Sequence, residues 1–374
     1  MNVILFFTYG VSLEDWDNSG LISREIKLYK ELSEKYKINF TFVTYGNSDD
    51  LKFLNLIDNL EIIPIYNIIK YSNNKFIRIL KSFIIPFYLK REIGNNPRII
   101  KTNQLYGAWV PILYKIITNS GLYIRTGYDL YTFSKYDNKN KIKQYFYLFL
   151  TFVALKVSDA YSVTSKVDFD FLKSKFSIKK NKLTLIPNWV DINENIRNID
   201  ERKNNIMTVG RLEKQKNYKF VIESIKDSEF ELVIYGDGSE KKDLLKFSKN
   251  LSNIHLKGTI QNSELLEEYQ NYKYFLSLSK YEGNSKAILE AMSAGCIVIA
   301  SKIRNNIELI DQLENGVLFD LESDNLLKVI KKLDGDIDLQ EKIFKNAIKK
   351  VKLRNSLNVI ASKEYNIFEI LNKC

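Results

Sequence analysis

Residues 276–301 read LSLSKYEGNSKAILEAMSAGCIVIAS and contain two apolar, strand-like runs with an amphipathic segment between them. The first run covers Tyr274 to Leu278, and the second covers Cys296 to Ala300. Between them, residues 285–294 have apolar side chains at helical spacing, and Gly295 is suited to end a helix. This order of strand, loop, helix and strand predicts one unit of a parallel α/β sheet.

Two carboxylates stand out in this stretch, Glu282 in the predicted loop and Glu290 in the predicted helix. The free N–H groups at a helix start attract anions, and carboxylates accept hydrogen bonds from hydroxyl groups. Together these features suit a sugar linked to a nucleotide diphosphate. The structural alternative is that Glu290 pairs with Lys286 one helical turn earlier and that Glu282 is a solvated loop charge.

The segment from Glu282 to Ser301 resembles the E-x7-E signature of the retaining glycosyltransferases of family 4, which use nucleotide-sugar donors. A second block, residues 207–212 followed by Lys216 and Asn217, is similar to the basic diphosphate loop of the same family. The resemblance is good over about the C-terminal half of the chain and diffuse before it. It implies an α/β protein of the GT-B fold, in which two Rossmann-like, doubly wound domains face each other across a cleft.

This resemblance assigns roles to residues of both blocks. Glu290 would hold the ribose hydroxyls of the donor, whereas Glu282 and the backbone N–H groups of residues 283–285 would contact the sugar. Arg211 and Lys216 would neutralise the departing diphosphate, so Arg211, Lys216 and Glu282 are the predicted catalytic residues. The complete predicted donor site consists of Gly210, Arg211, Lys216, Gly236, Glu282, Gly283, Asn284, Ser285 and Glu290.

A chain of 374 residues is suited to two domains. Strands alternate with helical stretches in the N-terminal half and are expected at Val3–Thr8, Ile38–Thr44, Leu60–Ile65, Arg98–Thr102, Leu122–Thr126 and Ala160–Thr164. The segment around Pro187 and Asn188 resembles the family's interdomain hinge. We therefore place an acceptor-binding domain at residues 1–190 and a nucleotide-sugar-binding domain at residues 191–356, with a final helix at about 357–374 that packs back on the first domain.

The acceptor site or cleft has four candidates in the N-terminal half, which are Gly20, Arg125, Tyr128 and Asp129. Gly20 closes a loop after the first strand, where GT-B enzymes bring glycines close to the donor phosphates. The alternative is that this loop is an acceptor-facing turn. Many family members have a His-Asp-like element where this chain has Tyr128 and Asp129, so a catalytic pair is not transferred. Asp129 could instead cap the next helix.

The 56 basic and 45 acidic residues leave a net charge of +11, which favours anionic partners. No nucleic-acid module accompanies that charge, so we expect no nucleic-acid partner.

The single histidine, His255, and the two cysteines, Cys296 and Cys374, suit neither a metal site nor a disulfide framework. We therefore expect no cofactor and no obligatory metal. Because no signal peptide or transmembrane run is apparent, a cytoplasmic protein is expected.

Residues 70–91 contain six basic and no acidic residues, interleaved with aromatic and aliphatic ones. One interpretation is peripheral contact with an anionic membrane, on its inner face. The other is a helix that buries its apolar side in the N-terminal sheet and shows its basic side to water. The apolar stretch 145–157 is too short to span a bilayer and predicts a core helix.

These observations predict a retaining glycosyltransferase that moves a sugar from a nucleotide-diphosphate sugar to a hydroxyl of a glycan or lipid-linked acceptor, in surface polysaccharide biosynthesis. Two alternatives remain open. One is a sugar-nucleotide epimerase or hydrolase on the same fold, and the other is a non-enzymatic basic binding protein. The base and sugar of the donor, the acceptor and the oligomeric state are not determined by the sequence.

Overall fold

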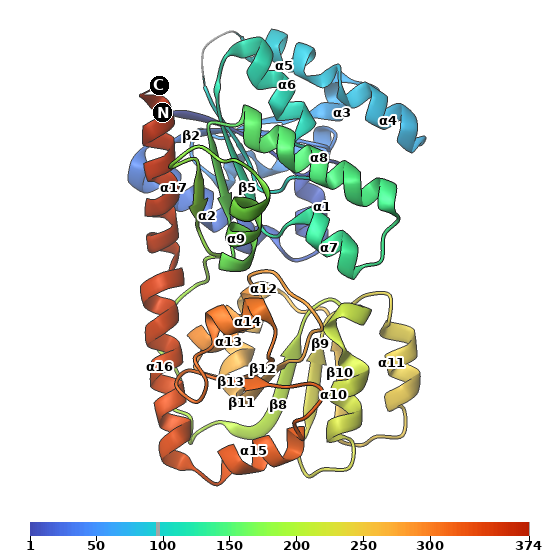
Figure 1. The fold of residues 1–374 in the computed structure, drawn as a ribbon, viewed down its shortest axis with the longest axis vertical. Coiled ribbons are helices and arrows are strands. Elements are labelled where there is room, and N and C mark those ends of the chain that lie inside the picture. The colour runs from blue at the N-terminus through green and yellow to red at the C-terminus, as the bar shows by residue number, and fades with distance from the viewer. Residues whose placement is uncertain (95–97, 374) are drawn as a thin grey trace. The chain divides into compact units, whose positions relative to one another are not determined.

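The computed structural model describes residues 1–94 and 98–373. The chain forms two compact units, one made of residues 1–187 and the chain from Ile360 onward, the other of residues 188–359. Each unit contains one parallel β-sheet with helices packed on it (Figure 1). The sequence placed the corresponding boundaries at residues 190 and 356. Cys374 lies outside the described residues.

The first unit has a seven-stranded sheet in the order β3-β2-β1-β4-β5-β6-β7. All neighbouring strands in it are parallel, and Val3 of β1 pairs with Phe40 of β2 and Ile99 of β4. The strands are β1 Asn2–Phe6, β2 Asn39–Thr44, β3 Glu61–Pro64, β4 Ile99–Thr102, β5 Gly121–Thr126, β6 Ala160–Val163 and β7 Leu183–Leu185. The six strands predicted for this half are all present, because each apolar run is buried in the sheet.

The second unit has a six-stranded sheet in the order β10-β9-β8-β11-β12-β13. Its strands are β8 Lys203–Val209, β9 Leu232–Tyr235, β10 Ile254–Gly258, β11 Tyr272–Ser277, β12 Ile297–Ser301 and β13 Val317–Phe319. All pairs are parallel, as the stretch 276–301 predicts. His255 lies in β10, the strand position expected for it.

Helices connect the strands in both units (Figure 1). In the first unit they are α1 Leu13–Asn18, α2 Ile22–Tyr36, η1 Ser48–Leu56, α3 Ile65–Ile68, α4 Lys75–Ser82, α5 Ile85–Ile93, α6 Trp109–Thr118, α7 Leu130–Tyr136, α8 Lys141–Val157 and α9 Lys166–Lys175. In the second they are η2 Lys214–Lys216, α10 Tyr218–Ile225, α11 Lys241–Ser248, α12 Asn262–Glu268, η3 Tyr269–Asn271, α13 Lys286–Ser293, α14 Arg304–Leu309, α15 Leu326–Asp334 and α16 Ile337–Asn355. The last helix, α17 Leu357–Asn372, crosses the boundary between the units.

The core of the second unit lies on both faces of its sheet, because successive strand residues point to opposite sides. Ile206 and Tyr274 pack with α10 and α15 in one apolar cluster. Their neighbours Met207 and Phe275 belong to a second cluster with α13 and α16. Helices on both faces make the strands apolar throughout, which is typical of parallel sheets.

Three details of the first unit differ from the expectations. The segment between Gly10 and Gly20 is not only loop but contains α1, which begins at a capping box formed by Ser12 and Asp15. Helix α8 covers the predicted core helix 145–157, yet it buries one side and leaves an apolar stripe exposed. Helix α4 does not bury its apolar side, since Phe76 is 81% exposed. No helix in the described ranges combines the length and apolarity needed to cross a membrane.

Candidate functional site

The two predicted blocks meet at one edge of the second sheet. In this sheet β9 and β10 lie on one side of β8, and β11 lies on the other. The carboxyl ends of the strands at such a reversal of strand order are where open α/β sheets bind ligands. The segment from Gly210 to Lys216 follows β8, and the segment from Ser279 to Ser285 follows β11. Parallel pairing of β8 with β11 therefore brings the predicted catalytic residues to this reversal point.

Lys216 and Glu282 form an ion pair across this point. The hydroxyl of Ser279 donates to the same Oε1 atom of Glu282 at 2.7 Å. Glu282 is 9% exposed, so the alternative that it is a solvated loop charge is wrong. Among the described residues Oε2 of Glu282 has no hydrogen-bond partner, which leaves it available to accept a bond from a ligand hydroxyl.

Gln215 joins the two loops through backbone and side chain. Its carbonyl oxygen accepts from the N–H of Lys280 at 2.9 Å, and its side-chain amide donates to the carbonyl of Tyr281 at 2.7 Å. Within the paired strands β8 and β11, the hydroxyl of Thr208 donates to the carbonyl of Leu276 at 2.8 Å. The two bonds of Gln215 therefore link the loops after β8 and β11 beside the ion pair.

Gly210 and Gly236 let the loops after β8 and β9 pack together. Their φ angles are 153° and 149°, in a region that side chains other than glycine rarely adopt. A Cβ on Gly236 would lie 1.9 Å from the carbonyl oxygen of Gly210, closer than two atoms can approach. The glycine at 236 is therefore required by backbone contact inside the loop pair, which places it beside the predicted diphosphate loop.

Glu290 is buried on α13 and accepts a hydrogen bond from the hydroxyl of Tyr269 at 3.3 Å. Ser285 caps the start of this helix, and its side chain accepts from the N–H of Ile288. The ammonium of Lys286 lies over the Trp189 ring, 4.9 Å from its centroid. A buried carboxylate near a capped helix start can bind hydroxyl groups of a ligand that reaches the edge of the sheet.

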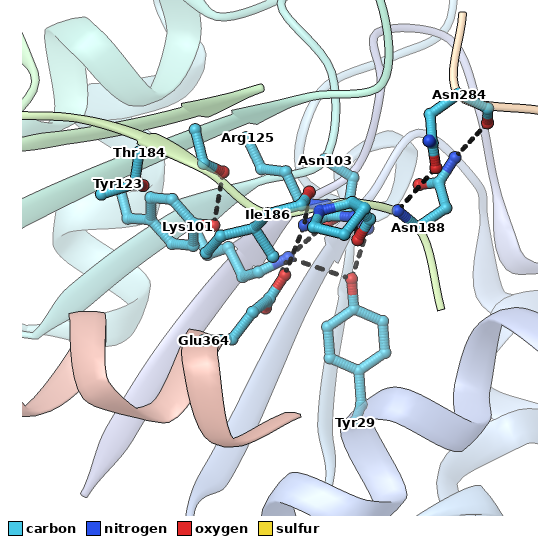
Figure 2. Close-up of polar contacts among 12 residues, drawn as sticks. Tyr29, Lys101, Asn103, Tyr123, Arg125, Thr184, Ile186, Asn188, Asn284 and Glu364 are labelled. Atoms are coloured by element: carbon cyan, nitrogen blue, oxygen red, sulfur yellow. Dashed lines mark hydrogen bonds and ion pairs between the residues drawn. The ribbon is translucent and has the colours of Figure 1, made fainter. Parts of the chain in front are cut away.

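Asn284 fixes the loop that carries Glu282 and the half-buried Gly283. Its side-chain oxygen accepts from the N–H of Asn188 at 2.9 Å, and its carbonyl accepts from the side-chain amide of Asn188 at 2.7 Å (Figure 2). The side chain of Asn355 donates to the carbonyl of Asn188 at 2.7 Å. The sequence indicated Asn188 only as part of a hinge, since no local pattern reveals a partner so far along the chain.

Tyr218 is a further residue of this site that the sequence did not single out. It is the first residue of α10, and a Cβ on Gly210 would lie 3.0 Å from its hydroxyl oxygen. Burial and the negative charge of Glu282 raise the pKa of Tyr218, so the hydroxyl stays protonated at neutral pH. Because a tyrosine in an amphipathic helix is typical of a core position, the sequence gave no indication that Tyr218 lies at the candidate site.

Arg211 is exposed next to these loops, and only its backbone carbonyl has a hydrogen bond in the described part of the chain, from the N–H of Glu213. Its guanidinium is thus free to bind an oxyanion. No group of three or more His, Cys, Asp or Glu residues that could hold a metal ion occurs within the described ranges.

The four acceptor-site candidates lie in the first unit. Arg125 is buried, with its guanidinium 3.3 Å from Oε1 of Glu364 (Figure 2). The same guanidinium donates to the carbonyls of Ile186 and Pro187, each at 3.2 Å. These contacts are all internal to the unit and give Arg125 a structural role.

Asp129 caps α7 and accepts from the N–H of Thr132 at 2.7 Å, which is the structural alternative predicted for it. Burial raises the pKa of Asp129. The ring of Tyr128 packs against that of Phe133, with centroids 4.4 Å apart. Gly20 has a φ of 67° just before α2. The structure thus places the predicted donor-site residues in the second unit, with Lys216 and Glu282 in contact, and the four acceptor-site candidates in the first.

The family model described as glycosyl transferases group 1 matches residues 190–350. Residues 190–350 are a group 1 glycosyl transferase domain. This group 1 domain contains Arg211, Lys216, Glu282 and Glu290, and it falls within the second compact unit.

Curated relatives match over part of their length. The chain is 27% identical over 223 residues to an uncharacterized 41.2 kDa protein in the cps region of Klebsiella pneumoniae, an alignment that covers 56% of this chain and 60% of the relative. It is 29% identical over 171 residues to the capsular polysaccharide biosynthesis glycosyltransferase CapH of Staphylococcus aureus, covering 43% of this chain and 47% of the relative. The chain thus spans about half the length of the curated relatives it matches.

Solved structures match over the whole chain. Sucrose-phosphate synthase from Thermosynechococcus elongatus has a TM-score of 0.77 and 15% identity, with 100% of both chains covered. Anabaena HepE, crystallised in complex with UDP, has a TM-score of 0.74, 15% identity and the same coverage. At this identity the likeness establishes the fold, which is GT-B with two parallel-sheet α/β domains.

Proposed function

We propose that this chain is a retaining glycosyltransferase of family 4 that moves a sugar from a nucleotide-diphosphate sugar to a hydroxyl of a glycan or lipid-linked acceptor. The observation that carries the proposal is the Lys216–Glu282 ion pair, which lies at the reversal point of strand order inside the group 1 domain. A cation and a carboxylate held there suit a ligand that has both phosphate and hydroxyl groups.

Lys216 has three N–H donors, of which the carboxylate of Glu282 uses one. The remaining donors, together with the free guanidinium of Arg211, neutralise negative charge that grows on the departing nucleoside diphosphate. Fixed charges of this kind lower the barrier because they need no reorganisation during the reaction. No metal ion is assigned a part in this step, since the two basic side chains supply the charge.

The carboxylates have separate tasks in this proposal. Glu282 presents its unused Oε2 atom to a sugar hydroxyl, and residues 283–285 offer backbone N–H groups beside it. Glu290 accepts hydrogen bonds from the ribose and exchanges its bond with Tyr269 for them. The retaining outcome follows from the family resemblance and is tested by the anomeric configuration of the product.

The donor and the setting also belong to the proposal. HepE was crystallised with UDP and with UDP-glucose, which supports a nucleotide-sugar donor for this chain. The relative CapH, a capsular polysaccharide biosynthesis glycosyltransferase, supports a role in surface polysaccharide biosynthesis. A lipid-linked acceptor would lie at the membrane, and we place the protein at its inner face through residues 70–91.

The first experiment is thermal unfolding of the purified protein with a panel of UDP-, GDP- and ADP-sugars. A ligand that binds the folded state raises the unfolding temperature, so the correct donor stabilises the wild type. Arg211→Ala and Glu290→Ala should each lose that shift, whereas Lys214→Ala, an exposed neighbour in the same turn, should keep it. If no nucleotide sugar stabilises the wild type at high concentration, the proposal is wrong.

Incubation with the stabilising donor separates the remaining enzyme classes. Transfer to an added glycan or lipid-linked acceptor supports the proposal. Release of free sugar without an acceptor identifies a hydrolase, and appearance of an isomeric nucleotide sugar identifies an epimerase. A protein that binds no nucleotide sugar but binds anions nonspecifically would be the non-enzymatic alternative.

A further inference from the structure

A pocket lies in the first unit at the carboxyl ends of β1, β2 and β3. Tyr9, Tyr45 and Tyr66 line it, and each follows one of these strands by a few residues. The enclosed space is about 10 Å³, enough for one water molecule, so a larger group would lie at the open mouth. The carboxyl edge of a parallel sheet is where ligands bind in α/β proteins. All of its lining residues belong to the first unit and lie outside residues 190–350.

The lining of this pocket is basic. Lys70, Arg78 and Lys81 line it, and no Asp or Glu does. Their hydrogen bonds go to neutral acceptors, because Arg78 donates to the hydroxyl of Tyr71 and Lys81 donates to the carbonyl of Lys70 at 2.8 Å. The sequence from residue 62 to residue 91 contains no acidic residue at all. The pocket therefore has uncompensated positive charge.

A buried hydroxyl in the pocket completes a site for an oxyanion. The hydroxyl oxygen of Tyr9 is shielded from solvent and has no hydrogen-bond partner in the described chain. Burial raises the pKa of Tyr9 to about 12, so the group is a hydrogen-bond donor at neutral pH. One unused donor beside three cations matches the several acceptor oxygens of a phosphate group.

Helix α4 has cations on its pocket side and large apolar side chains on its outer side. Arg78 and Lys81 are half-buried, whereas Phe76 is 81% and Leu80 is 68% exposed. The exposed apolar set continues through α5 and consists of Tyr71, Phe76, Ile77, Ile79, Leu80, Phe83, Ile84, Phe87 and Tyr88. This is the reverse of a surface helix that shows its basic side to water, and it needs an apolar partner.

Helix α8 extends this apolar surface. Its exposed apolar residues are spaced along one helical face at Ile142, Tyr145, Phe146, Phe149 and Phe152. Trp109 connects the two parts, since its ring nitrogen donates to Ser82 at the end of α4 at 2.8 Å and its ring centroid lies 6.3 Å from that of Phe146. The sequence from residue 138 to residue 158 also lacks acidic residues. We call the exposed apolar residues of α4, α5 and α8 the apolar face.

We propose that the first unit binds an anionic phospholipid bilayer, with the apolar face in the interfacial region and one lipid phosphate at the mouth of the pocket, beside Arg78 and Lys81. A phospholipid is the partner that joins a phosphate to hydrocarbon, and it therefore satisfies both sides of α4 at once. The basic residues beside the apolar face attract the anionic headgroups. This inference deepens the membrane placement made in the proposed function and does not depend on the transfer reaction.

Vesicle sedimentation tests the proposal with the full chain. Vesicles of phosphatidylcholine alone are compared with vesicles that also contain phosphatidylglycerol. The wild type should bind the anionic vesicles at least about tenfold more tightly, because each basic residue near the surface contributes about fivefold. The double variant Phe76→Ser/Leu80→Ser should lose binding, whereas Ile337→Ser, exposed in the second unit, should not. Equal binding by all proteins would overturn the proposal.

A matched pair of charge variants tests the pocket. Arg78→Gln/Lys81→Gln removes two cations from the pocket, and Lys75→Gln/Arg91→Gln removes two exposed cations from the same segment. The pocket variant should lose at least about tenfold more affinity for anionic vesicles than the surface variant. Equal losses would show diffuse attraction only and overturn the phosphate site. Inorganic phosphate, added at constant ionic strength, should not displace the protein from anionic vesicles. Displacement would show that the pocket accepts free phosphate equally well and would exclude a lipid-specific site.

The oligomeric state provides the remaining test. The proposal predicts that the apolar face is not a contact between copies of the chain. A wild type that is a dimer without vesicles, together with a Phe76→Ser/Leu80→Ser variant that is a monomer, would show such a contact, and the bilayer proposal would then be wrong. Unchanged circular dichroism shows that each variant is folded, and an unchanged donor-induced shift in unfolding temperature shows that its second unit still binds the donor. Because that shift reports on the second unit, failure of vesicle binding and failure of the proposed transferase function are measured independently.

Discussion

The ammonium of Lys101 lies 3.3 Å from Oε2 of Glu364, and both side chains are completely shielded from solvent (Figure 2). Lys101 is in β4, and Glu364 is in the part of α17 that belongs to the first unit. The other carboxylate oxygen of Glu364 faces Arg125. One buried carboxylate therefore pairs with two buried cations and attaches the end of the chain to the first sheet.

Glu364→Ala should destabilise the first unit strongly. It leaves Lys101 and Arg125 buried without a counter-charge, which costs about 3–5 kcal/mol in comparable pairs. Denaturant unfolding of the variant measures this loss. The control is Asn366→Ala, an exposed position on the same helix that should change stability by less than about 0.5 kcal/mol. Similar stabilities for both variants would contradict a structural role for the cluster.

The same cluster should make stability depend on pH. Burial lowers the pKa of Lys101 to about 8 from 10.5. Between these values the unfolded chain binds more protons than the folded one, so the stability contribution of this group rises as pH increases from about 8 to about 10.5. The free energy of unfolding of the wild type, minus that of Lys101→Met, should therefore increase over this range. A constant difference would contradict the prediction.

Lys216→Met should reduce the transfer rate by about 10²–10³-fold, the usual cost of removing one group that stabilises transition-state charge. Lys214→Met, in the same turn but exposed, should keep the wild-type rate. The assay uses the donor that stabilises the wild type. A chelator such as EDTA should leave the wild-type rate unchanged, since no metal ion takes part in the proposed step. Loss of activity with EDTA would require a metal and revise that step.

Gly236→Ala should cost more than Gly258→Ala, although both glycines have positive φ angles. At Gly258 an added Cβ has no atom within 4 Å, so only backbone strain of about 1–2 kcal/mol is expected. At Gly236 the Cβ also collides with the carbonyl of Gly210 and must displace the predicted diphosphate loop. Unfolding and donor-affinity measurements compare the two variants. Equal effects would show that the loop contact is unimportant.

Asn284→Ala should weaken donor binding and lower stability by about 1–3 kcal/mol, because the backbone N–H of Asn188 loses its partner. The loop with Glu282 is then less well held. Asn195→Ala, an exposed asparagine of the same unit, is the control. Calorimetric titration with the donor, alongside thermal unfolding, checks both effects, and unchanged affinity would show that the loop is positioned by other contacts.

The sequence by itself determined the elements of the second sheet and the residue types of the predicted donor site. The parallel strands and α13 follow from local apolar spacing and from a glycine at a helix end, features that depend on neighbours a few residues away. The two blocks with Arg211, Lys216, Glu282 and Glu290 were recognisable for the same reason, since each is contiguous in the chain. Their common location required only the rule that parallel strands end at one edge.

Only the tertiary structure decided which charges meet and which apolar surfaces remain exposed. Lys101 and Glu364 lie in different halves of the sequence, and no local periodicity relates them. The segment with Phe76 and the helix with Phe149 read as apolar in the sequence whether buried or exposed, because the pattern records composition and not what covers it. Burial, pairing and exposure are properties of the packed chain, and they distinguish a structural arginine at 125 from the free one at 211.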